Sequence, residues 1–226
     1  MSARDVNRLR EQIATYGKSL FDRGLTMGSS GNISVRLDDG GWLMTPTNAC
    51  LGRLDPASIS TLSATGEWLD GDKPTKESFL HMAMYAERPQ SEAIVHLHST
   101  HSVAVSCLPD VDHHDCIPPL TAYYVMRVGR LPLVPYHVPG DPSLGDAVRG
   151  LAGKHSAVLL ANHGPVVAGK SLEPSSSKKR TRPSSCSWIG SAKWDCRSRW
   201  TISAAGAPRS WPFNELGRTG SKSTAA

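Results

Sequence analysis

The sequence lacks the features that would assign it to a membrane or a secreted class. It contains no run of about 18 apolar residues, the length that a transmembrane helix needs. The first residues, MSARDVNRLREQIA, are charged and contain no apolar stretch, so no secretory signal is expected. The five cysteines form no CxxC pair, which favours reduced thiols over a disulfide framework. We therefore expect a cytoplasmic protein with no membrane partner.

Most of the chain lacks an excess of positive charge, although the net charge of the whole chain is +5. Residues 1–172 contain 15 Lys and Arg against 17 Asp and Glu, whereas residues 173–226 contain 10 against 3. The last segment also holds 12 serines and four of the six tryptophans. It could be a basic nucleic-acid-binding arm, but the absence of any periodicity favours a disordered or non-native tail. We expect no nucleic-acid partner.

The length favours one buried core, so we predict one domain over residues 1–172 and an atypical tail over residues 173–226. Helical spacing predicts an amphipathic helix from Val6 to Leu20. Alternation and turn residues predict strands at 33–37 and 42–45, and at 60–62 and 67–69, joined as two hairpins. Further strands are predicted at 93–97, 132–136, 157–161 and 165–168, and helices at 100–107 and 142–152. This order predicts an α/β fold with a mixed sheet covered by helices.

A further helix is predicted to open at Pro74-Thr75, with Thr75 as its N-cap. Its apolar face would consist of Phe79, Met82, Ala83 and Ala86. Glu77 then lies in the first turn, where the helix dipole favours acidic residues in any case. The functional interpretation is a carboxylate that binds a metal ion without substrate and moves a proton when substrate is present.

Histidines occur at a spacing that suits a metal ion. His96 and His98 lie two residues apart on a predicted strand and so share one face. A lone histidine on a strand is more often a core residue, but the burial of two unpaired imidazoles is costly. His163 ends another apolar strand, and Gly164 after it allows close backbone approach. Three nitrogen ligands leave a position for substrate, which predicts a catalytic site for a divalent metal, with zinc favoured.

Three loops are rich in glycine, hydroxyl and amide groups: residues 28–34, 45–47 and 74–76. Turns are rich in these residues anyway, but such loops also bind anions through N–H and hydroxyl donors. The predicted helix N-terminus at Thr75 and the charge of Lys76 would suit a phosphate group.

In order, the motifs GNIS, TPT, PTKE, HLHS and NHG resemble the class II aldolase/adducin family, from about residue 4 to 172. The resemblance implies a three-layer α/β/α fold with a mixed, largely antiparallel sheet, and a homotetramer with sites between subunits. It implies that Zn²⁺ binds to Glu77, His96, His98 and His163, and that Glu77 is also catalytic. A catalytic tyrosine from a neighbouring subunit would be Tyr123, with Tyr124 the alternative. The implied phosphate pocket consists of Ser29, Gly31, Asn32, Thr47, Thr75 and Lys76.

Longer stretches such as HLHSTHSVAVSCL and PPLTAYYVMRVG are similar to the 3-oxo-tetronate 4-phosphate decarboxylases of this family. The similarity implies a carbon–carbon lyase of sugar-acid catabolism that forms dihydroxyacetone phosphate and carbon dioxide through an enediolate stabilised by the metal. A fuculose-phosphate-like aldolase would form the same enediolate, and a catalytically inactive adducin-like module would bind no zinc. After GKSLE the family continues as a helix, whereas EPSSSKKRTRP stands here. This departure predicts a disordered or frame-shifted tail and leaves the assembly of this chain open.

Overall fold

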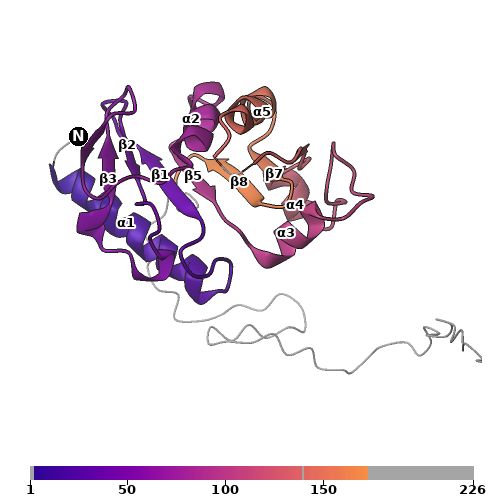
Figure 1. Cartoon of the computed structure of the whole chain (residues 1–226), viewed down its shortest axis with the longest axis horizontal. Coiled ribbons are helices and arrows are strands. Elements are labelled where there is room, and N and C mark those ends of the chain that lie inside the picture. Colours follow the sequence, from indigo (N-terminus) through magenta and orange to yellow (C-terminus); the bar gives the residue numbers. More distant parts are fainter. Residues whose placement is uncertain (1–2, 139, 173–226) are drawn as a thin grey trace, which may run out of the picture. The chain divides into compact units, whose positions relative to one another are not determined.

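A mixed sheet forms the centre of the structure, a computed structural model that describes residues 3–138 and 140–172. In this part of the chain eight strands lie in the order β4-β3-β2-β1-β5-β8-β7-β6 (Figure 1). They are β1 Asn32–Arg36, β2 Trp42–Met44, β3 Ser60–Leu62, β4 Trp68–Asp70, β5 Ala93–His96, β6 Leu133–Val134, β7 Ala157–Leu160 and β8 Gly164–Gly169. The pair β6–β7 is parallel, and the other neighbours are antiparallel. The predicted mixed, largely antiparallel sheet is confirmed.

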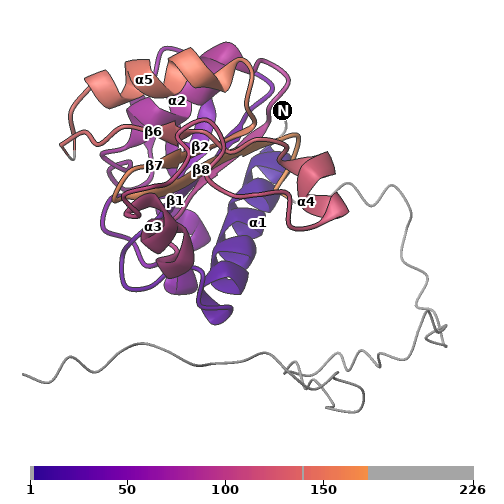
Figure 2. The ribbon, with the colours of Figure 1, turned by 90° about the vertical axis from the view of Figure 1, so that its right-hand side faces the viewer.

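Helices cover both faces of this sheet. Figure 2 shows α2 (Ser78–Glu87) and α5 (Ser143–Ala152) on one face, and α1 (Ala3–Asp22) and α3 (Thr100–Ser106) on the other. The other helical segments are α4 Ala122–Arg127 and two 3-10 helices, η1 Leu51–Arg53 and η2 Pro56–Ser58. The predicted three-layer α/β/α arrangement is therefore confirmed.

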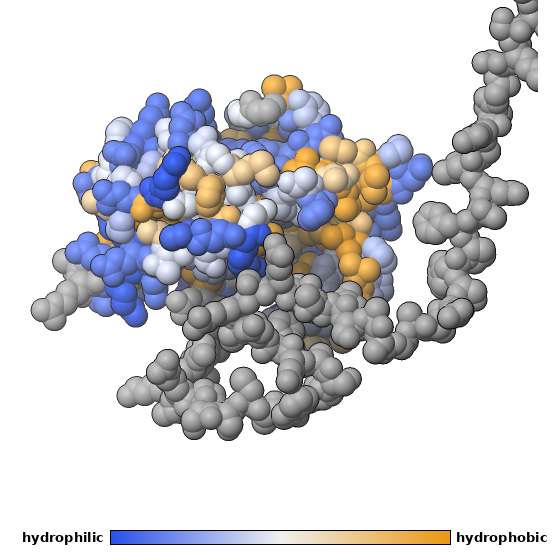
Figure 3. Space-filling view, turned by 90° about the horizontal axis from the view of Figure 1, so that it is seen from below, coloured by the Kyte–Doolittle hydropathy of each residue, from blue (hydrophilic) through white to orange (hydrophobic). Residues whose placement is uncertain are grey.

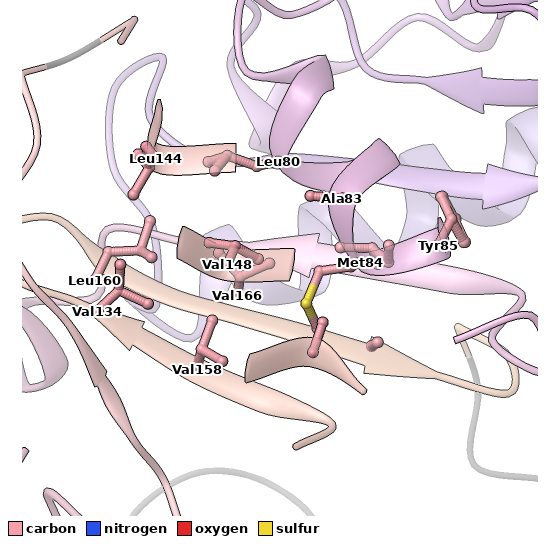
Figure 4. Packing of buried hydrophobic residues seen from close by; sticks show 13 residues of the cluster. Leu80, Ala83, Met84, Tyr85, Val134, Leu144, Val148, Val158, Leu160 and Val166 are labelled. Carbon is pink, nitrogen blue, oxygen red and sulfur yellow. The ribbon is translucent and has the colours of Figure 1, made fainter. Parts of the chain in front are cut away.

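Strand alternation gives each face of the sheet its own core. On β1, Ile33 packs on the α1 side, whereas Ser34 contacts α2. The core between the sheet and α2 and α5 is largely aliphatic and includes Leu80, Met84, Leu144, Val148, Val158, Leu160 and Val166 (Figure 4). Burial of each such side chain stabilises the fold by about 1.5–3 kcal/mol. This packing fixes α2 against the strands that carry the candidate site.

The predicted start of α2 at Thr75 is wrong, because the helix begins at Ser78 and Glu77 is its N-cap residue. The N–H of Thr75 donates to the carbonyl of Thr45 at 3.2 Å, so this segment pairs with the strand side instead of entering the helix. The predicted apolar face is also partly wrong. Ala83 is buried as expected, but the fully buried large side chains are Leu80, Met84 and His81, and Ala86 is exposed.

Most other predicted elements are confirmed within a few residues, including both hairpins. The sequence did not predict α4, and β6 is shorter than the predicted strand 132–136. No helix among the described residues has both the length and the apolarity to cross a membrane. The predicted tail, residues 173–226, lies outside the described residues, and the boundary at residue 172 stays a prediction.

Candidate metal centre

Three histidines and one glutamate converge at the N-terminus of α2, the end of β5 and the turn between β7 and β8. The donor atoms of Glu77, His96, His98 and His163 all lie within 4.8 Å of one another. Oε1 of Glu77 is 3.0 Å from Nε2 of His163, and Oε2 is 3.6 Å from Nε2 of His96. The Nε2 atoms of His96 and His98 are 3.0 Å apart. The structure thus brings together all four residues that were expected to bind a metal.

The backbone explains this convergence. His96 ends β5 and His98 follows two residues later, just beyond the strand, with its ring centroid 4.9 Å from that of His96. His163 lies between β7 and β8 and is followed by Gly164, whose φ is 150°. A Cβ atom on Gly164 would lie 2.1 Å from the carbonyl oxygen of Leu97. The close backbone approach that was expected at Gly164 is therefore present.

The protonation of His96 fits a cation at this position. Nδ1 of His96 lies 3.0 Å from the carbonyl oxygen of Pro165 and must donate to it. Burial, the main cause, lowers the pKa of this ring from 6.5 to about 4, so it is neutral near pH 7. Nε2 then carries a lone pair, which faces the carboxylate of Glu77. Converging lone pairs of nitrogen and oxygen are the donor set of a divalent metal.

Glu77 is ionised at neutral pH. Burial is the strongest single influence and raises its pKa, but hydrogen bonds from His163 and Asn32 and the electrostatic influence of the His96 and His163 rings outweigh it. The resulting pKa is about 2, compared with the ordinary 4.5. The side chain is 22% exposed, so a ligand can reach the carboxylate. An ionised, accessible carboxylate suits both metal binding and proton transfer.

Asn32 and Thr75 hold the carboxylate from the sheet side. Nδ2 of Asn32 donates to Oε2 of Glu77 at 2.7 Å and to Oγ1 of Thr75 at 3.3 Å. Oγ1 of Thr75 also accepts the N–H of Glu77 at 3.3 Å. No described contact in residues 3–138 and 140–172 uses the hydroxyl proton of Thr75, so this proton is free to reach a bound anion.

The other residues expected to bind phosphate lie on loops near this point. The N–H of Thr47 donates to the carbonyl of Lys73 at 2.9 Å, which holds segments 45–47 and 73–75 side by side. Gly31 has a φ of 80°, and a Cβ atom there would lie 2.9 Å from the carbonyl oxygen of His96. Ser29 and Lys76 are exposed. The geometry brings the three loops together, and phosphate binding stays a prediction.

The two candidate tyrosines lie on α4. Tyr123 is 64% exposed, and its ring contacts the guanidinium of Arg127 at 5.4 Å. The hydroxyl of Tyr124 is buried without a hydrogen-bond partner among the described residues. Among the described contacts, none joins either tyrosine to the four-residue group, so a role for Tyr123 stays a prediction.

The sequence did not indicate that His81 belongs to this region. Its side chain is fully buried on α2, and Nε2 lies 2.5 Å from Oδ1 of Asn32. Its position could have indicated a role, because His81 lies between Leu80 and Met84 on the buried face of the helix and one turn after Glu77. A polar side chain at such a position requires a partner.

Comparisons with known proteins match the same span of the chain. The family described as Class II Aldolase and Adducin N-terminal domain matches residues 11–176. A 3-oxo-tetronate 4-phosphate decarboxylase from Pectobacterium atrosepticum is 52% identical over 165 residues, which cover 73% of this chain and 76% of the relative. An L-fuculose phosphate aldolase from Escherichia coli is 33% identical over 74% of this chain and 75% of the relative. The crystal structure of YgbL from Klebsiella pneumoniae is 52% identical, with a TM-score of 0.72 and coverage of 74% of this chain and 81% of that chain.

Proposed function

This chain belongs to the class II aldolase and adducin family, and on that premise we propose that it decarboxylates a 3-oxo-tetronate 4-phosphate to dihydroxyacetone phosphate. The observation that carries the proposal is a difference between relatives. Relatives named as this decarboxylase are 52% identical to the chain, whereas those named as L-fuculose phosphate aldolase are 33% identical. The complete group of Glu77, His96, His98 and His163 supports an active enzyme over an inactive module.

The proposed reaction balances without a co-reactant. The C1–C2 bond of the 3-oxo acid breaks, carbon dioxide departs, and the electron pair is shared between C2 and the C3 oxygen as an enediolate. A proton added to C2 then yields dihydroxyacetone phosphate. An aldolase of this family would form a similar enediolate by releasing an aldehyde, so the two reactions differ in the group that leaves.

Zinc is the proposed metal, held by Glu77, His96, His98 and His163. Three imidazoles and one carboxylate are a donor set that Zn²⁺ favours, and one carboxylate ligand can give way to substrate. When bound, the ion would polarise the C3 carbonyl and stabilise the negative charge that develops on its oxygen. Glu77 or Tyr123 handles the proton that reaches C2, and the proximity of Glu77 to the three histidines favours the glutamate. Because Glu77 is ionised, it would first take up a proton from the C2 hydroxyl of the substrate or from water, and then pass it to C2.

The phosphate group of the substrate is proposed to bind Ser29, Gly31, Asn32, Thr47, Thr75 and Lys76. Support comes from the pairing of segments 45–47 and 73–75 and from the free hydroxyl proton of Thr75. Lys76 adds a positive charge at the exposed edge of this region. Because a charged phosphate ester does not cross membranes unaided, we place the reaction in the cytoplasm.

A homotetramer is the proposed assembly, with Tyr123 acting in the site of a neighbouring subunit. Large apolar side chains around α4 are exposed: Leu120, Tyr123, Val125 and Met126. Figure 3 shows apolar side chains gathered toward the side on which α3 and α4 lie in Figure 1. An exposed apolar patch next to a candidate catalytic tyrosine supports burial against a second copy.

The test measures carbon dioxide release from 3-oxo-tetronate 4-phosphates by the zinc-loaded protein, beside retro-aldol cleavage of fuculose 1-phosphate. We expect carbon dioxide and dihydroxyacetone phosphate in equal amounts from the first substrate. Cleavage of fuculose 1-phosphate without any release of carbon dioxide from the 3-oxo acids would replace the decarboxylase with the aldolase. Absence of both activities and of bound zinc would favour the adducin-like module.

A further inference from the structure

A chain of hydrogen bonds leads from Glu77 into the core between β1 and α2. Behind the contact between Glu77 and Asn32, Oδ1 of Asn32 lies 2.5 Å from Nε2 of His81. Nδ1 of His81 lies 2.7 Å from Oγ of Ser34, and this hydroxyl is 3.0 Å from the hydroxyl of Tyr85. Asn32, Ser34, His81 and Tyr85 are all at most 4% exposed. The candidate site is therefore backed by a buried polar network that spans from the sheet to the helix.

The arrangement of protons from Glu77 to Ser34 follows from the groups that can only accept. The carboxylate of Glu77 can only accept, so the NH₂ group of Asn32 must face it and Oδ1 must face His81. Oδ1 also only accepts, so Nε2 of His81 carries the proton. Nδ1 is then the acceptor for the hydroxyl of Ser34. The hydroxyl of Tyr85 is 3.0 Å from Oγ of Ser34 and 3.5 Å from the carbonyl oxygen of Glu92, and either oxygen can accept its proton. The donor directions from Asn32 to Ser34 therefore follow from the negative charge on Glu77.

The imidazole of His81 is suited to this task because it is neutral. Burial, the main cause, lowers its pKa from 6.5 to about 3. A neutral imidazole offers one donor and one acceptor on opposite sides of a rigid ring, which matches the two partners of His81. If Asn32 rotated its amide by half a turn, its oxygen would face the carboxylate oxygen at 2.7 Å, and two acceptors would repel each other.

We propose that His81 is a positioning residue that locks the amide of Asn32 and thereby holds Glu77 toward the three histidines. His81 contacts neither the donor atoms of the histidines nor any reacting group, and it acts only through Asn32. Its effect on turnover rests on the proposed function, whereas its effects on metal affinity and on proton position do not.

Three variants at two adjacent residues of α2 distinguish a positioning role of His81 from a role in core packing. His81→Gln keeps an N–H donor that can reach Asn32, and His81→Leu removes both hydrogen bonds at similar volume. Leu80→Ala is the control, because the side chain of Leu80 is also fully buried in this core but is apolar. We expect zinc affinity to fall about 10-fold in His81→Leu and to stay within about 3-fold of wild type in the other two.

Zinc affinity is measured by competition with a chromophoric chelator, and kcat and KM are measured on the 3-oxo acid phosphate. A loss in kcat with little change in KM is expected for His81→Leu, with recovery in His81→Gln. Equal losses of zinc affinity in His81→Leu and Leu80→Ala, or no loss in His81→Leu, would overturn the proposal. If the wild-type protein releases no carbon dioxide, only the proposed function is contradicted. The comparison of zinc affinities still tests the role of His81.

A measurement on the wild-type protein remains decisive even if His81→Leu does not fold. Long-range ¹H–¹⁵N correlation spectra identify which ring nitrogen of a histidine carries the proton. We expect a neutral His81 with its proton on Nε2. A proton on Nδ1, or on both nitrogens at neutral pH, is incompatible with the arrangement.

Discussion

At the residue scale, Glu77 meets two different requirements with its two carboxylate oxygens. Oε1 contacts His163 at 3.0 Å, and Oε2 accepts from Asn32 at 2.7 Å. A Glu77→Gln substitution keeps the shape but removes the charge and the site for a proton. We expect kcat for carbon dioxide release to fall by about 10²–10⁴-fold, the usual contribution of a positioned acid or base.

The control for this substitution is Glu87→Gln at the exposed end of the same helix, which should retain wild-type turnover. Metal content is measured on both variants by elemental analysis. A Glu77→Gln protein that binds zinc and keeps full turnover would exclude Glu77 as the residue that transfers the proton.

His81 also predicts how stability depends on pH. Its pKa is about 3 in the folded protein and near 6.5 once unfolding exposes it, so the unfolded state binds the extra proton between these values. Stability therefore decreases as pH falls through this window, by at most about 1.4 kcal/mol per pH unit for this group. Urea unfolding of metal-free protein at about pH 7 and about pH 5 measures the effect.

His81→Gln is the comparison, because the other titrating groups, His96 included, are common to both proteins. The variant should lose less stability than wild type over the same interval. An equal loss in the two proteins would mean that His81 is not the group that takes up the proton.

At the element scale, the turn from β7 to β8 determines where His163 lies. Asn162 has a φ of 57°, and its N–H donates to Oγ of Ser106 at 3.0 Å, which ties the turn to α3. Gly164 packs so closely on the backbone of Leu97 that a Cβ atom would overlap the carbonyl oxygen of Leu97. Gly164→Ala should therefore displace His163, destabilise the fold by about 1–3 kcal/mol and weaken zinc binding by at least about 10-fold.

Gly150→Ala on α5 is a matched control, since a Cβ atom there meets nothing within 4 Å. In a helix this exchange should leave stability unchanged or raise it by up to about 1 kcal/mol. Thermal unfolding and chelator competition give both quantities. Wild-type zinc affinity in Gly164→Ala would show that the turn has other ways to place the histidine.

Local patterns in the sequence predict the elements that depend on near neighbours. The hairpins follow from alternation and turn residues, and the side-by-side placement of His96 and His98 follows from the two-residue period of a strand. The start of α2 did not follow, because it depends on a hydrogen bond between Thr75 and Thr45. The role of His81 depends on Asn32, 49 residues away in the sequence. Such partners become visible only when the fold brings the segments together.

At the scale of the whole molecule, the candidate site joins segments that are distant in sequence. Helix α2 supplies Glu77 at its N-terminus, the end of β5 supplies His96, and the turn before β8 supplies His163. The strand spacing indicated the first two histidines from the residues alone. His163 and Glu77 were proposed from their own surroundings, at a strand end before a glycine and in a predicted first helical turn. The resemblance to a family supported their combination in one site, since no local pattern connects residues 77 and 163.

Because one ion would contact all of these segments, its removal should affect the stability of the whole fold. A ligand at 100 times its Kd stabilises the folded state by about 2.7 kcal/mol. For a chain of this size we expect chelation to lower Tm by roughly 5–10 °C, with recovery when zinc is restored. Differential scanning calorimetry with and without chelator measures the change.

A ligand variant separates this linkage from nonspecific effects of zinc. His98 is only half-buried, so His98→Ala leaves a smaller void than a change at the fully buried His96. The variant should unfold near the Tm of chelated wild type and gain little from added zinc, since one of four donor groups is missing. If zinc raises the Tm of both proteins equally, the ion binds elsewhere and the four residues do not form its site.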